Sequence, residues 1–457
     1  MESRIDAGSA PATKAIALID GEHYPEVTRD ALRFLTESRG CRLVALVFLG
    51  GTEKLARLDP GVFGDLPLYS GSGQIADLRR AIAENPADAV YDLSDEPVVG
   101  YVERFRLASE ALALGVSYIG ADFTFEAPRR PYLCAKPSIG VWGSGKRVGK
   151  TAVSGYMARY LAGKGERSIP CVCTMGRGGP PSPELLFSPG DVTDTFLRRR
   201  VEEGRHAASD HFEDAMTAGV VTVGCRRCGA GLAGEPFYSN VPEGAKLACE
   251  QDADLVIFEG SGAAIPPVGV DAVMLVASAA QPLEYLLGYL GPYRLLLSDL
   301  LVVTMCQESL VSSEKLRRLI DGALCINPEV KVVKTVFRPR PLGNLPGRKV
   351  FLASTAPPRG LQEQAEHLER EYGALIVGKS HHLADRARLE RDLEGAEGAE
   401  VLATELKAAG VDTVSIYARK SGKELTYIEN LPVALEGSLE EEIDRLEDMA
   451  RAKSLGR

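Results

Sequence analysis

The stretch from residue 137 to residue 151 constrains this chain more than any other. Apolar residues 138–142 run into the loop Gly-Ser-Gly-Lys-Arg-Val-Gly-Lys-Thr, and residues 152–163 have the pattern of an amphipathic helix. A strand, a glycine-rich loop and a helix in this order are the context of a phosphate-binding P-loop, whose backbone N–H groups and helix N-terminus hold phosphates. We therefore predict nucleotide binding by Gly143, Ser144, Gly145, Lys146, Arg147, Val148, Gly149, Lys150 and Thr151.

The last two residues of the loop have distinct expected roles. Lys150 is expected to reach the β- and γ-phosphates, and the Thr151 hydroxyl to hold Mg²⁺. The spacing departs from the common motif, because five residues rather than four separate Gly143 from Gly149, and the usual first glycine falls on Ser144.

A second signal lies at residues 254–262, Asp-Leu-Val-Ile-Phe-Glu-Gly-Ser-Gly. A strand of bulky apolar residues delivers Glu259 into a loop of small residues, as a Walker B element does. Glu259 is expected to bind Mg²⁺ opposite Thr151, directly or through water. ATP and Mg²⁺ are thus the expected cofactors, with Lys150, Glu259 and Arg177 as the expected catalytic residues.

Composition limits the class of protein. A chain of 457 residues should divide into two or three domains, and its net charge of −10 argues against a sequence-independent grip on nucleic acid. No apolar run is long enough to span a bilayer, and the N-terminus has no signal-peptide core. Nine cysteines, most of them in apolar strands, are typical of a reduced protein. We expect a cytoplasmic protein with no membrane or nucleic-acid partner.

The first 130 residues alternate strand and helix patterns after a flexible tail at 1–13. We predict an N-terminal Rossmann-like α/β domain with a parallel sheet at 14–130. Polar residues gather where its strands end, and they either form a site or shape turns and cap helices. They are Asp20, Glu22, His23, Asp92 and Asp95.

The rest of the chain continues as α/β. We predict a P-loop NTPase domain at 137–390 and a small α/β C-terminal extension at 391–457. Within the extension, residues 400–409 are expected to be helical and 413–417 to form a strand. Ser438, with Glu441 three residues later, is the expected cap of a final helix.

Two further patterns allow alternative interpretations. Arg177 lies in a Gly/Pro-rich loop at 175–181, which either clamps an anion or makes a turn with a solvated arginine. Cys225-Arg226-Arg227-Cys228 has zinc-knuckle spacing without a second pair, so it indicates zinc only weakly; a turn presenting two arginines to an anion is at least as good an interpretation.

The P-loop is similar in spacing to the extended loop of dethiobiotin synthetase, and residues 254–262 resemble that family's Glu-Gly-Ala-Gly element. Over the whole chain, the sequence resembles the cyclic 2,3-diphosphoglycerate synthetase family. The matching features are residues 18–24 (Leu-Ile-Asp-Gly-Glu-His-Tyr), the P-loop, 174–179 (Thr-Met-Gly-Arg-Gly-Gly), the Glu259 element and 427–430 (Tyr-Ile-Glu-Asn).

The resemblance implies an ATP- and Mg²⁺-dependent ligase, a cyclising synthetase. It would close the intramolecular pyrophosphate ring of cyclic 2,3-diphosphoglycerate from 2,3-diphosphoglycerate and release ADP and phosphate. A substrate with about four to five negative charges needs several cations. The expected substrate-binding residues are Arg177, Arg205, His206, His211, Arg226 and Arg227.

Other functions are open to the same loop. One is a 2-phosphoglycerate kinase or another P-loop ligase that phosphorylates an oxyanion. A different class is a nucleotide-switched partitioning-type ATPase, although its extra lysine would fall on Gly145 here. A homodimer is the expected oligomer, because two-fold dimers are the commonest symmetric assemblies.

Overall fold

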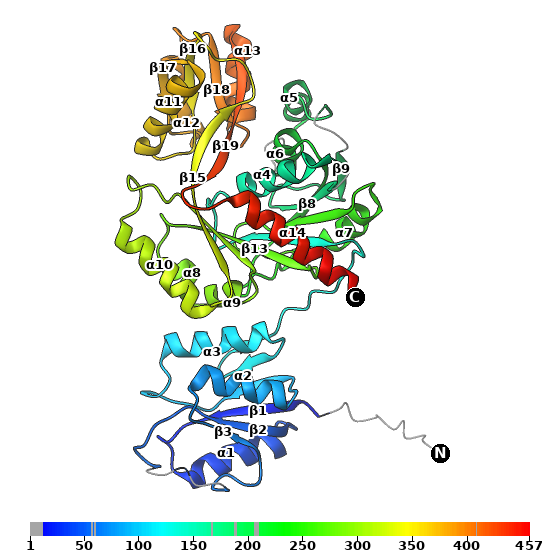
Figure 1. Cartoon of the computed structure of the whole chain (residues 1–457), viewed down its shortest axis with the longest axis vertical. Helices are drawn as coiled ribbons and strands as arrows, with labels where there is room; N and C mark the ends of the chain where they lie inside the picture. The colour runs from blue at the N-terminus through cyan, green and yellow to red at the C-terminus, as the bar shows by residue number, and fades with distance from the viewer. Residues whose placement is uncertain are drawn as a thin grey trace. The chain divides into compact units, whose positions relative to one another are not determined.

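The computed structural model describes residues 12–55, 58, 61–165, 168–186, 190–204, 210–407 and 409–457. The chain divides into two compact units (Figure 1). Unit 1 comprises Met1–Pro128 and Gly288–Leu297, and unit 2 comprises Arg129–Leu287 and Ser298–Arg457. The tail predicted at 1–13 lies almost entirely outside the described residues.

Unit 1 contains a sheet in the order β3-β2-β1-β4-β5-β6, parallel except for the edge strand β6. The order reverses between β1 and β4, so the predicted Rossmann-like parallel sheet is confirmed. Its strands are β1 (Lys14–Ile19), β2 (Arg42–Phe48), β3 (Leu68–Tyr69), β4 (Ala89–Asp92), β5 (Ser117–Ile119) and β6 (Thr124–Phe125). Its helices are α1 (Pro25–Glu37), α2 (Gln74–Glu84), α3 (Tyr101–Ala113) and α9 (Gly291–Leu296).

The polar residues at the carboxyl ends of β1 and β4 mainly fold their own loops. Asp20 accepts hydrogen bonds from the backbone N–H groups of Glu22 (3.0 Å) and Asp95 (2.6 Å), and its carboxylate lies 2.7 Å from His23 Nδ1. Asp92 accepts from the Tyr118 hydroxyl at 2.7 Å. These contacts agree with turn-shaping roles for these side chains.

Unit 2 is built on one long sheet in the order β11-β10-β8-β12-β7-β13-β14-β15-β19-β18-β16-β17, with β9 paired to β10. Strands of the P-loop portion are β7 (Ser138–Gly143), β8 (Pro170–Gly176), β9 (Glu184–Leu186), β10 (Val221–Cys228), β11 (Tyr238–Ser239), β12 (Leu255–Glu259), β13 (Ala272–Ser278), β14 (Leu300–Thr304) and β15 (Lys331–Pro341). Its helices are α4 (Lys150–Ala162), α5 (Asp194–Glu202), α6 (Asp210–Ala218), α7 (Val241–Glu250), α8 (Glu284–Leu287), α10 (Ser313–Ile326) and α14 (Leu439–Leu455).

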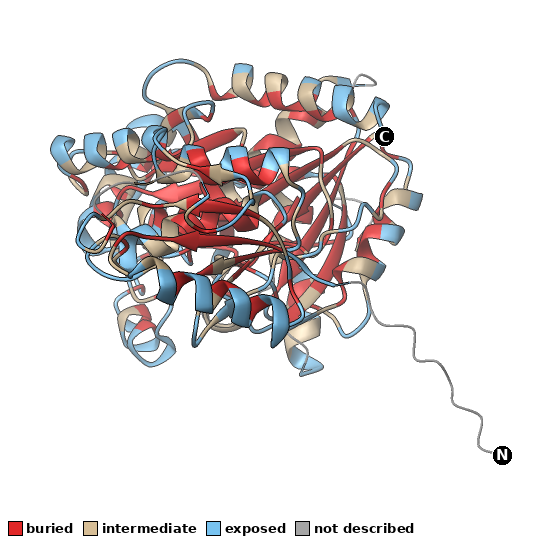
Figure 2. Cartoon of the chain, turned by 90° about the horizontal axis from the view of Figure 1, so that it is seen from below, coloured by how far each residue is buried: buried red, intermediate tan, exposed pale blue. Residues whose placement is uncertain are grey.

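The central strands of this portion are buried on both faces, which explains their continuous apolar sequences. In Figure 2 the strands are buried while the helices present exposed outer faces. The final helix α14 begins as predicted, with the Ser438 hydroxyl accepting a hydrogen bond from the Glu441 N–H at 3.1 Å.

The C-terminal portion of unit 2 is joined to the P-loop portion by an antiparallel ribbon of β15 and β19 (Glu424–Ala434) (Figure 1). It contains β16 (Lys349–Ala353), β17 (Leu375–Ser380), β18 (Val401–Glu405), α11 (Pro358–Tyr372), α12 (Arg386–Glu394), a π-helical turn at Gly410–Val414 and α13 (Ser415–Ser421).

Strand directions in the ribbon determine where the two portions meet. Strands β16, β17 and β18 run parallel to β19, and β19 runs opposite to β15, which is parallel to the P-loop strands. The carboxyl ends of the C-terminal strands therefore point back toward the carboxyl edge of the P-loop sheet. Both edges are positions where α/β sheets bind ligands.

The structure corrects three expectations for this region. The domain boundary expected at 390/391 falls inside α12. The sheet passes from the P-loop strands to the C-terminal strands within β15, where the antiparallel pairing with β19 begins. Residues 401–405 form a buried strand rather than a helix, because pairing with β16 and β19 overrides helical propensity. Residues 413–417 lie in a π-helical turn and α13 rather than in a strand.

Candidate functional site

The P-loop has the predicted geometry, with β7 ending at Gly143 and α4 beginning at Lys150. Neighbouring strand ends hold the loop in place. The Ser144 N–H donates to the Val276 carbonyl at 2.9 Å, and the Thr304 hydroxyl donates to the Val148 carbonyl at 2.7 Å. These bonds leave the turn of the loop preformed around its phosphate-binding N–H groups.

Two glycines of the loop are required by space and backbone conformation. Gly149 has φ +82°, and a Cβ there would lie 2.2 Å from the Phe337 ring. A Cβ on Gly143 would lie 2.9 Å from the Gly262 carbonyl oxygen. The loop therefore packs closely against both the ribbon strand β15 and the loop that follows Glu259.

Lys150 forms a buried ion pair with Glu259. Their side chains are 7% and 0% exposed, respectively. Burial lowers the pKa of Lys150, but the charges of Glu259 and Asp210 outweigh it and hold that pKa above its usual value. Glu259 thus pairs with Lys150, the lysine that is expected to bind a nucleotide phosphate.

Acidic residues of α6, which are not among the predicted site residues, complete this cluster. Asp210, Glu213 and Asp214 have the i, i+3, i+4 spacing that places side chains on one helix face. Asp214 is fully buried and accepts a hydrogen bond from the Thr174 hydroxyl at 2.5 Å. The Thr174 hydroxyl also lies 3.4 Å from Glu259 Oε2, so α6 faces the Walker B carboxylate.

The crowding of carboxylates changes their titration. Burial, followed by the Glu259 charge, raises the pKa of Asp214, and burial raises the pKa of Asp210 despite nearby Lys150. Burial raises the pKa of Glu213 to about 8. The cluster carries more carboxylate than lysine, so a cation or protons must balance it.

These donors fit Mg²⁺. Carboxylate and hydroxyl oxygens are available from Glu259, Asp214 and Thr151, and Asp214 Oδ1 has no hydrogen-bond partner among the described residues. Among the residues that the structure describes, no group of three or more His, Cys, Asp or Glu side chains could hold a metal ion by itself. Mg²⁺ usually takes one or two carboxylates and completes its shell with water and substrate phosphates, so an open donor set is suitable.

Two arginines lie beside the loop that follows Glu259. Arg227 is buried and donates from Nη2 to the Ser261 carbonyl at 2.9 Å. From the ideal Cβ position on Gly262, Arg177 Nη2 lies at 3.4 Å and Arg227 Nη2 at 3.7 Å. Burial and then the Arg177 charge lower the pKa of Arg227. Two neighbouring guanidinium groups at this edge would be stabilised by an anion.

The other predicted substrate residues have different placements. Arg226 donates from Nε to the Gly179 carbonyl at 3.0 Å and so shapes the Gly/Pro-rich loop. His211 is buried against Phe212, 3.4 Å from Glu184, and burial lowers its pKa. The structure therefore places His211 in the interior of unit 2, against Phe212 and Glu184. Arg205 and His206 lie outside the described residues.

The Cys225–Cys228 pair lies at the end of β10 rather than in a turn. Cys225 is buried with its sulfur 3.8 Å from Cys173 Sγ, whereas Cys228 is exposed. Residues three apart on a strand point to opposite faces. The two thiols therefore do not converge on a zinc ion.

The Tyr-Ile-Glu-Asn segment at 427–430 connects the C-terminal portion to the P-loop portion. The Tyr427 hydroxyl donates to Asp194 at 3.0 Å, and Glu429 accepts from Arg159 of α4 at 2.7 Å. Asn430 donates from Nδ2 to Glu405 at 2.7 Å. The segment thus ties the P-loop helix to the strands of the C-terminal portion.

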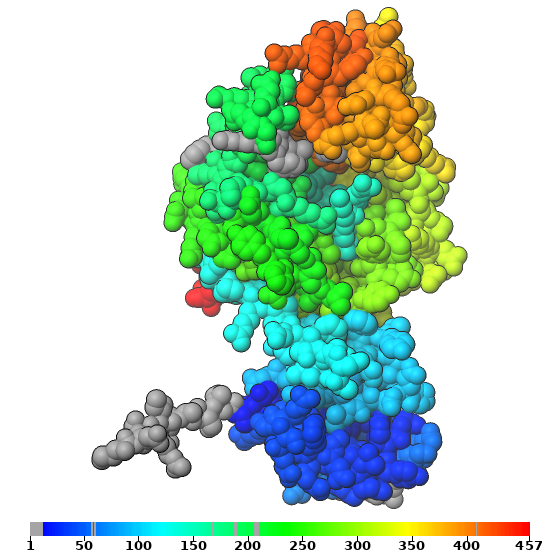
Figure 3. All heavy atoms as spheres, turned by 180° about the vertical axis from the view of Figure 1, so that it is seen from behind, coloured from blue at the N-terminus to red at the C-terminus, as the bar shows by residue number. Residues whose placement is uncertain are grey.

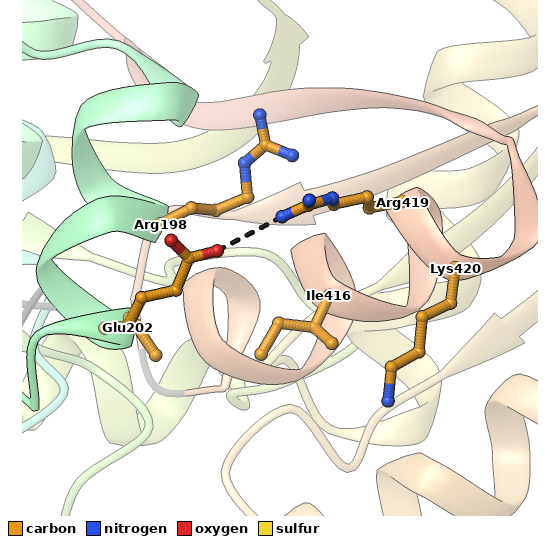
Figure 4. A pocket seen from close by; sticks show the side chains of 6 residues that line it. Arg198, Glu202, Ile416, Arg419 and Lys420 are labelled. Carbon is orange, nitrogen blue, oxygen red and sulfur yellow. Dashed lines mark hydrogen bonds and ion pairs between the residues drawn. The ribbon is translucent and has the colours of Figure 1, made fainter.

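A surface hollow lies between α5 and α13, which meet on the surface of unit 2 (Figure 3). Arg419 reaches Glu202 at 3.1 Å across it, as Figure 4 shows. Its lining residues are Arg198, Val201, Glu202, Ile416, Arg419 and Lys420. None of them contributes to the P-loop cluster, which is the candidate functional site.

The fold and this site define an α/β protein with a nucleotide-binding P-loop. None of the described helices is long and apolar enough to cross a membrane. Family models of cyclic 2,3-diphosphoglycerate synthetase match its N-terminal domain at residues 14–126, its P-loop domain at 138–336 and its C-terminal domain at 341–431. The chain therefore belongs to the cyclic 2,3-diphosphoglycerate synthetase family, and its membership implies an enzyme.

Whole-chain relatives agree with the family models. The protein named cyclic 2,3-diphosphoglycerate synthetase in Rubrobacter xylanophilus is 49% identical over 429 residues, covering 93% of this chain and 96% of that protein. The protein of the same name in Methanothermobacter thermautotrophicus is 44% identical over 436 residues, covering 93% of each chain. The solved hydrogenase maturation factor HypB of Archaeoglobus fulgidus matches with 14% identity and a TM-score of 0.28, covering 44% of this chain and 82% of that one; a match this weak carries no argument.

Proposed function

We propose that this protein is an ATP- and Mg²⁺-dependent synthetase that converts 2,3-diphosphoglycerate into its cyclic pyrophosphate and releases ADP and phosphate. One observation carries the proposal: in a member of this family, one edge of the P-loop sheet carries both a nucleotide site and two arginines. The P-loop lysine and the buried Glu259–Asp214 cluster lie at the carboxyl edge of this sheet, and Arg177 and Arg227 lie at the same edge. That combination suits a nucleotide triphosphate and a second anion.

The reaction divides into two displacements. An oxygen of one substrate phosphate attacks the γ-phosphorus of ATP, the bond to the β-phosphate oxygen breaks, and ADP leaves. The second substrate phosphate then attacks the phosphorus of the activated phosphate, closes the P–O–P ring and expels inorganic phosphate. Ionised phosphate oxygens are the nucleophiles in both steps, so no strong general base is required.

The residues of the site contribute binding, orientation and charge neutralisation, which dominate phosphoryl transfer. Lys150 would release Glu259 and bind the β- and γ-phosphates of ATP instead. The released Glu259, with Thr151 and Asp214, would hold Mg²⁺, which supplies further neutralisation of phosphate charge when bound. Arg177 and Arg227 would hold the glycerate phosphates and bring the two reacting groups together. Oriented intramolecular attack can lower a barrier by about 7–11 kcal/mol.

Product analysis tests the proposal against its rivals. Incubation with ATP, Mg²⁺ and 2,3-diphosphoglycerate should yield one inorganic phosphate and one cyclic product for each ADP. ADP with a newly phosphorylated product and no free phosphate would instead identify a kinase. Nucleotide hydrolysis indifferent to phosphorylated glycerates would support a partitioning-type ATPase. A cytoplasmic homodimer is our accompanying prediction, which cell fractionation and light scattering test.

A further inference from the structure

The Tyr-Ile-Glu-Asn segment leads from the P-loop helix to a second lysine. Asn430 holds Glu405, and Glu405 Oε1 lies 3.3 Å from the Lys407 ε-amino group. We propose that Lys407 is a substrate-binding residue, a cation supplied by the C-terminal portion to a phosphate of the phosphorylated acid. This inference rests on the proposed function and assigns one of its substrate contacts.

Glu405 is built as a fixed support for this lysine. Its Oε2 accepts hydrogen bonds from the Thr355 N–H at 2.7 Å and the Thr355 hydroxyl at 2.8 Å, while Asn430 donates to Oε1 at 2.7 Å. Burial opposes ionisation of Glu405, but the Lys407 charge and the Thr355 bonds hold its pKa below the usual value. A carboxylate with both oxygens bound orients a neighbouring ammonium group.

Lys407 faces the same acidic cluster as the P-loop lysine. Burial raises the pKa of Asp210, and the charges of both Lys150 and Lys407 oppose that rise. Leu406, the residue before Lys407, lies in one buried hydrophobic cluster with Phe212 and Ala215 of α6. The acidic face of α6 therefore lies within electrostatic reach of a lysine from each portion of unit 2.

Sheet topology explains this convergence. Glu405 is the last residue of β18, whose carboxyl end points back along the ribbon toward the edge where Glu259 ends β12. The Lys407 side chain is 40% exposed, in contrast to the 7% of Lys150, so part of it lies at the surface of the protein. A lysine fixed on one side and accessible on the other suits an anion that arrives from solvent.

The arrangement indicates how substrate charge is accommodated. In the structure each lysine is paired with carboxylates, Lys150 with Glu259 and Lys407 with Glu405. A bound phosphate would accept hydrogen bonds from the Lys407 amine while Glu405 keeps the amine in position. ATP would use Lys150, so the two lysines would serve the two different phosphorylated ligands.

The test separates substrate binding from nucleotide binding. Lys407→Ala should raise KM and Kd for 2,3-diphosphoglycerate by about 10- to 100-fold, the range for losing a charged hydrogen bond. KM for ATP should stay within about threefold, and Lys407→Arg should recover much of the loss. Lys420→Ala, at an exposed lysine of α13, is the matched control and should leave all three constants unchanged. Kd comes from calorimetry with Mg²⁺ and a non-hydrolysable ATP analogue.

Two further results are informative. Asn430→Ala should raise KM for 2,3-diphosphoglycerate less than Lys407→Ala does, and it should add little in the double variant, because both act through one amine. An unchanged KM for 2,3-diphosphoglycerate in a folded Lys407→Ala variant would overturn the inference. Equal losses of ATP and substrate affinity with a lowered melting temperature would also overturn it, since they indicate a structural role. Wild-type protein that forms no cyclic product would instead refute the proposed function, and this inference with it.

Discussion

Replacement of Glu259 by glutamine removes the negative charge at the centre of the site while preserving its shape. Glu259 has no exposed side-chain surface, and its carboxylate pairs with Lys150, which is also buried. Complete removal of one partner from a buried pair costs about 3–5 kcal/mol, because the other charge is left uncompensated. Here Gln can still accept a hydrogen bond from Lys150, and Asp214 should ionise more readily, because the Glu259 charge that raises its pKa is gone.

We therefore expect Glu259→Gln to lower the free energy of unfolding by about 1–3 kcal/mol, the range for a weakened buried polar contact. Activity should fall about 10²- to 10³-fold, as for other losses of one electrostatic group in a phosphate or oxyanion site. Single-turnover ADP release with saturating 2,3-diphosphoglycerate measures the rate, and urea unfolding measures the stability. Glu84→Gln in unit 1, a carboxylate bonded to the Tyr69 hydroxyl, is a control that should leave the rate unchanged. A folded Glu259→Gln variant within fivefold of the wild-type rate would refute the reasoning.

Three further changes follow from the same geometry. Gly149→Ala should reduce ATP affinity at least tenfold and lower the melting temperature, because φ is +82° and the new Cβ would meet Phe337; unaltered fluorescence titration with an ATP analogue would contradict this. Arg177→Ala should abolish the stimulation of ATP hydrolysis by phosphorylated glycerates and leave the basal rate unchanged. The control Arg199→Ala, at a side chain that is 78% exposed on α5, should keep the stimulation. Full stimulation in Arg177→Ala would exclude a substrate role for Arg177. The pKa of Glu213 lies near 8 when folded and near 4.5 when unfolded, so its protonated form stabilises the fold most below pH 4.5 and this contribution is lost as pH rises through 8. Glu213→Gln should thus flatten the decline in melting temperature between pH 5 and pH 8. An equal decline in both proteins would show that another group causes it.

The sequence predicted the parts of the site that depend on local pattern. The P-loop and the Glu259 strand are contiguous motifs. The structure places Lys150 and Glu259 in contact because β7, which leads into the P-loop, pairs with β12, which ends at Glu259. Asp214 was missed because its contact with Thr174 joins residues 40 positions apart. The acidic i, i+3, i+4 face of α6 was the available signal for it.

The C-terminal portion was harder to predict because tertiary pairing decides its structure. Residues 401–405 become a strand through their neighbours β16 and β19. The ribbon that brings Lys407 toward α6 pairs residues that are 87 to 99 positions apart, from Pro341 opposite Ile428 to Thr335 opposite Ala434. Periodicity within a short window carries no information about such a pairing. The same long-range contacts give the 427–430 segment its role, which no pattern within those residues indicates.

Phosphorus NMR of the reaction mixture tests the central claim most directly. Wild-type protein with ATP, Mg²⁺ and 2,3-diphosphoglycerate should convert the two phosphomonoester resonances into a coupled pair in the pyrophosphate region. ADP and inorganic phosphate should appear at the same rate, and Lys150→Ala should show none of these changes. Persistence of both phosphomonoester resonances while the folded wild-type protein consumes ATP would contradict the account.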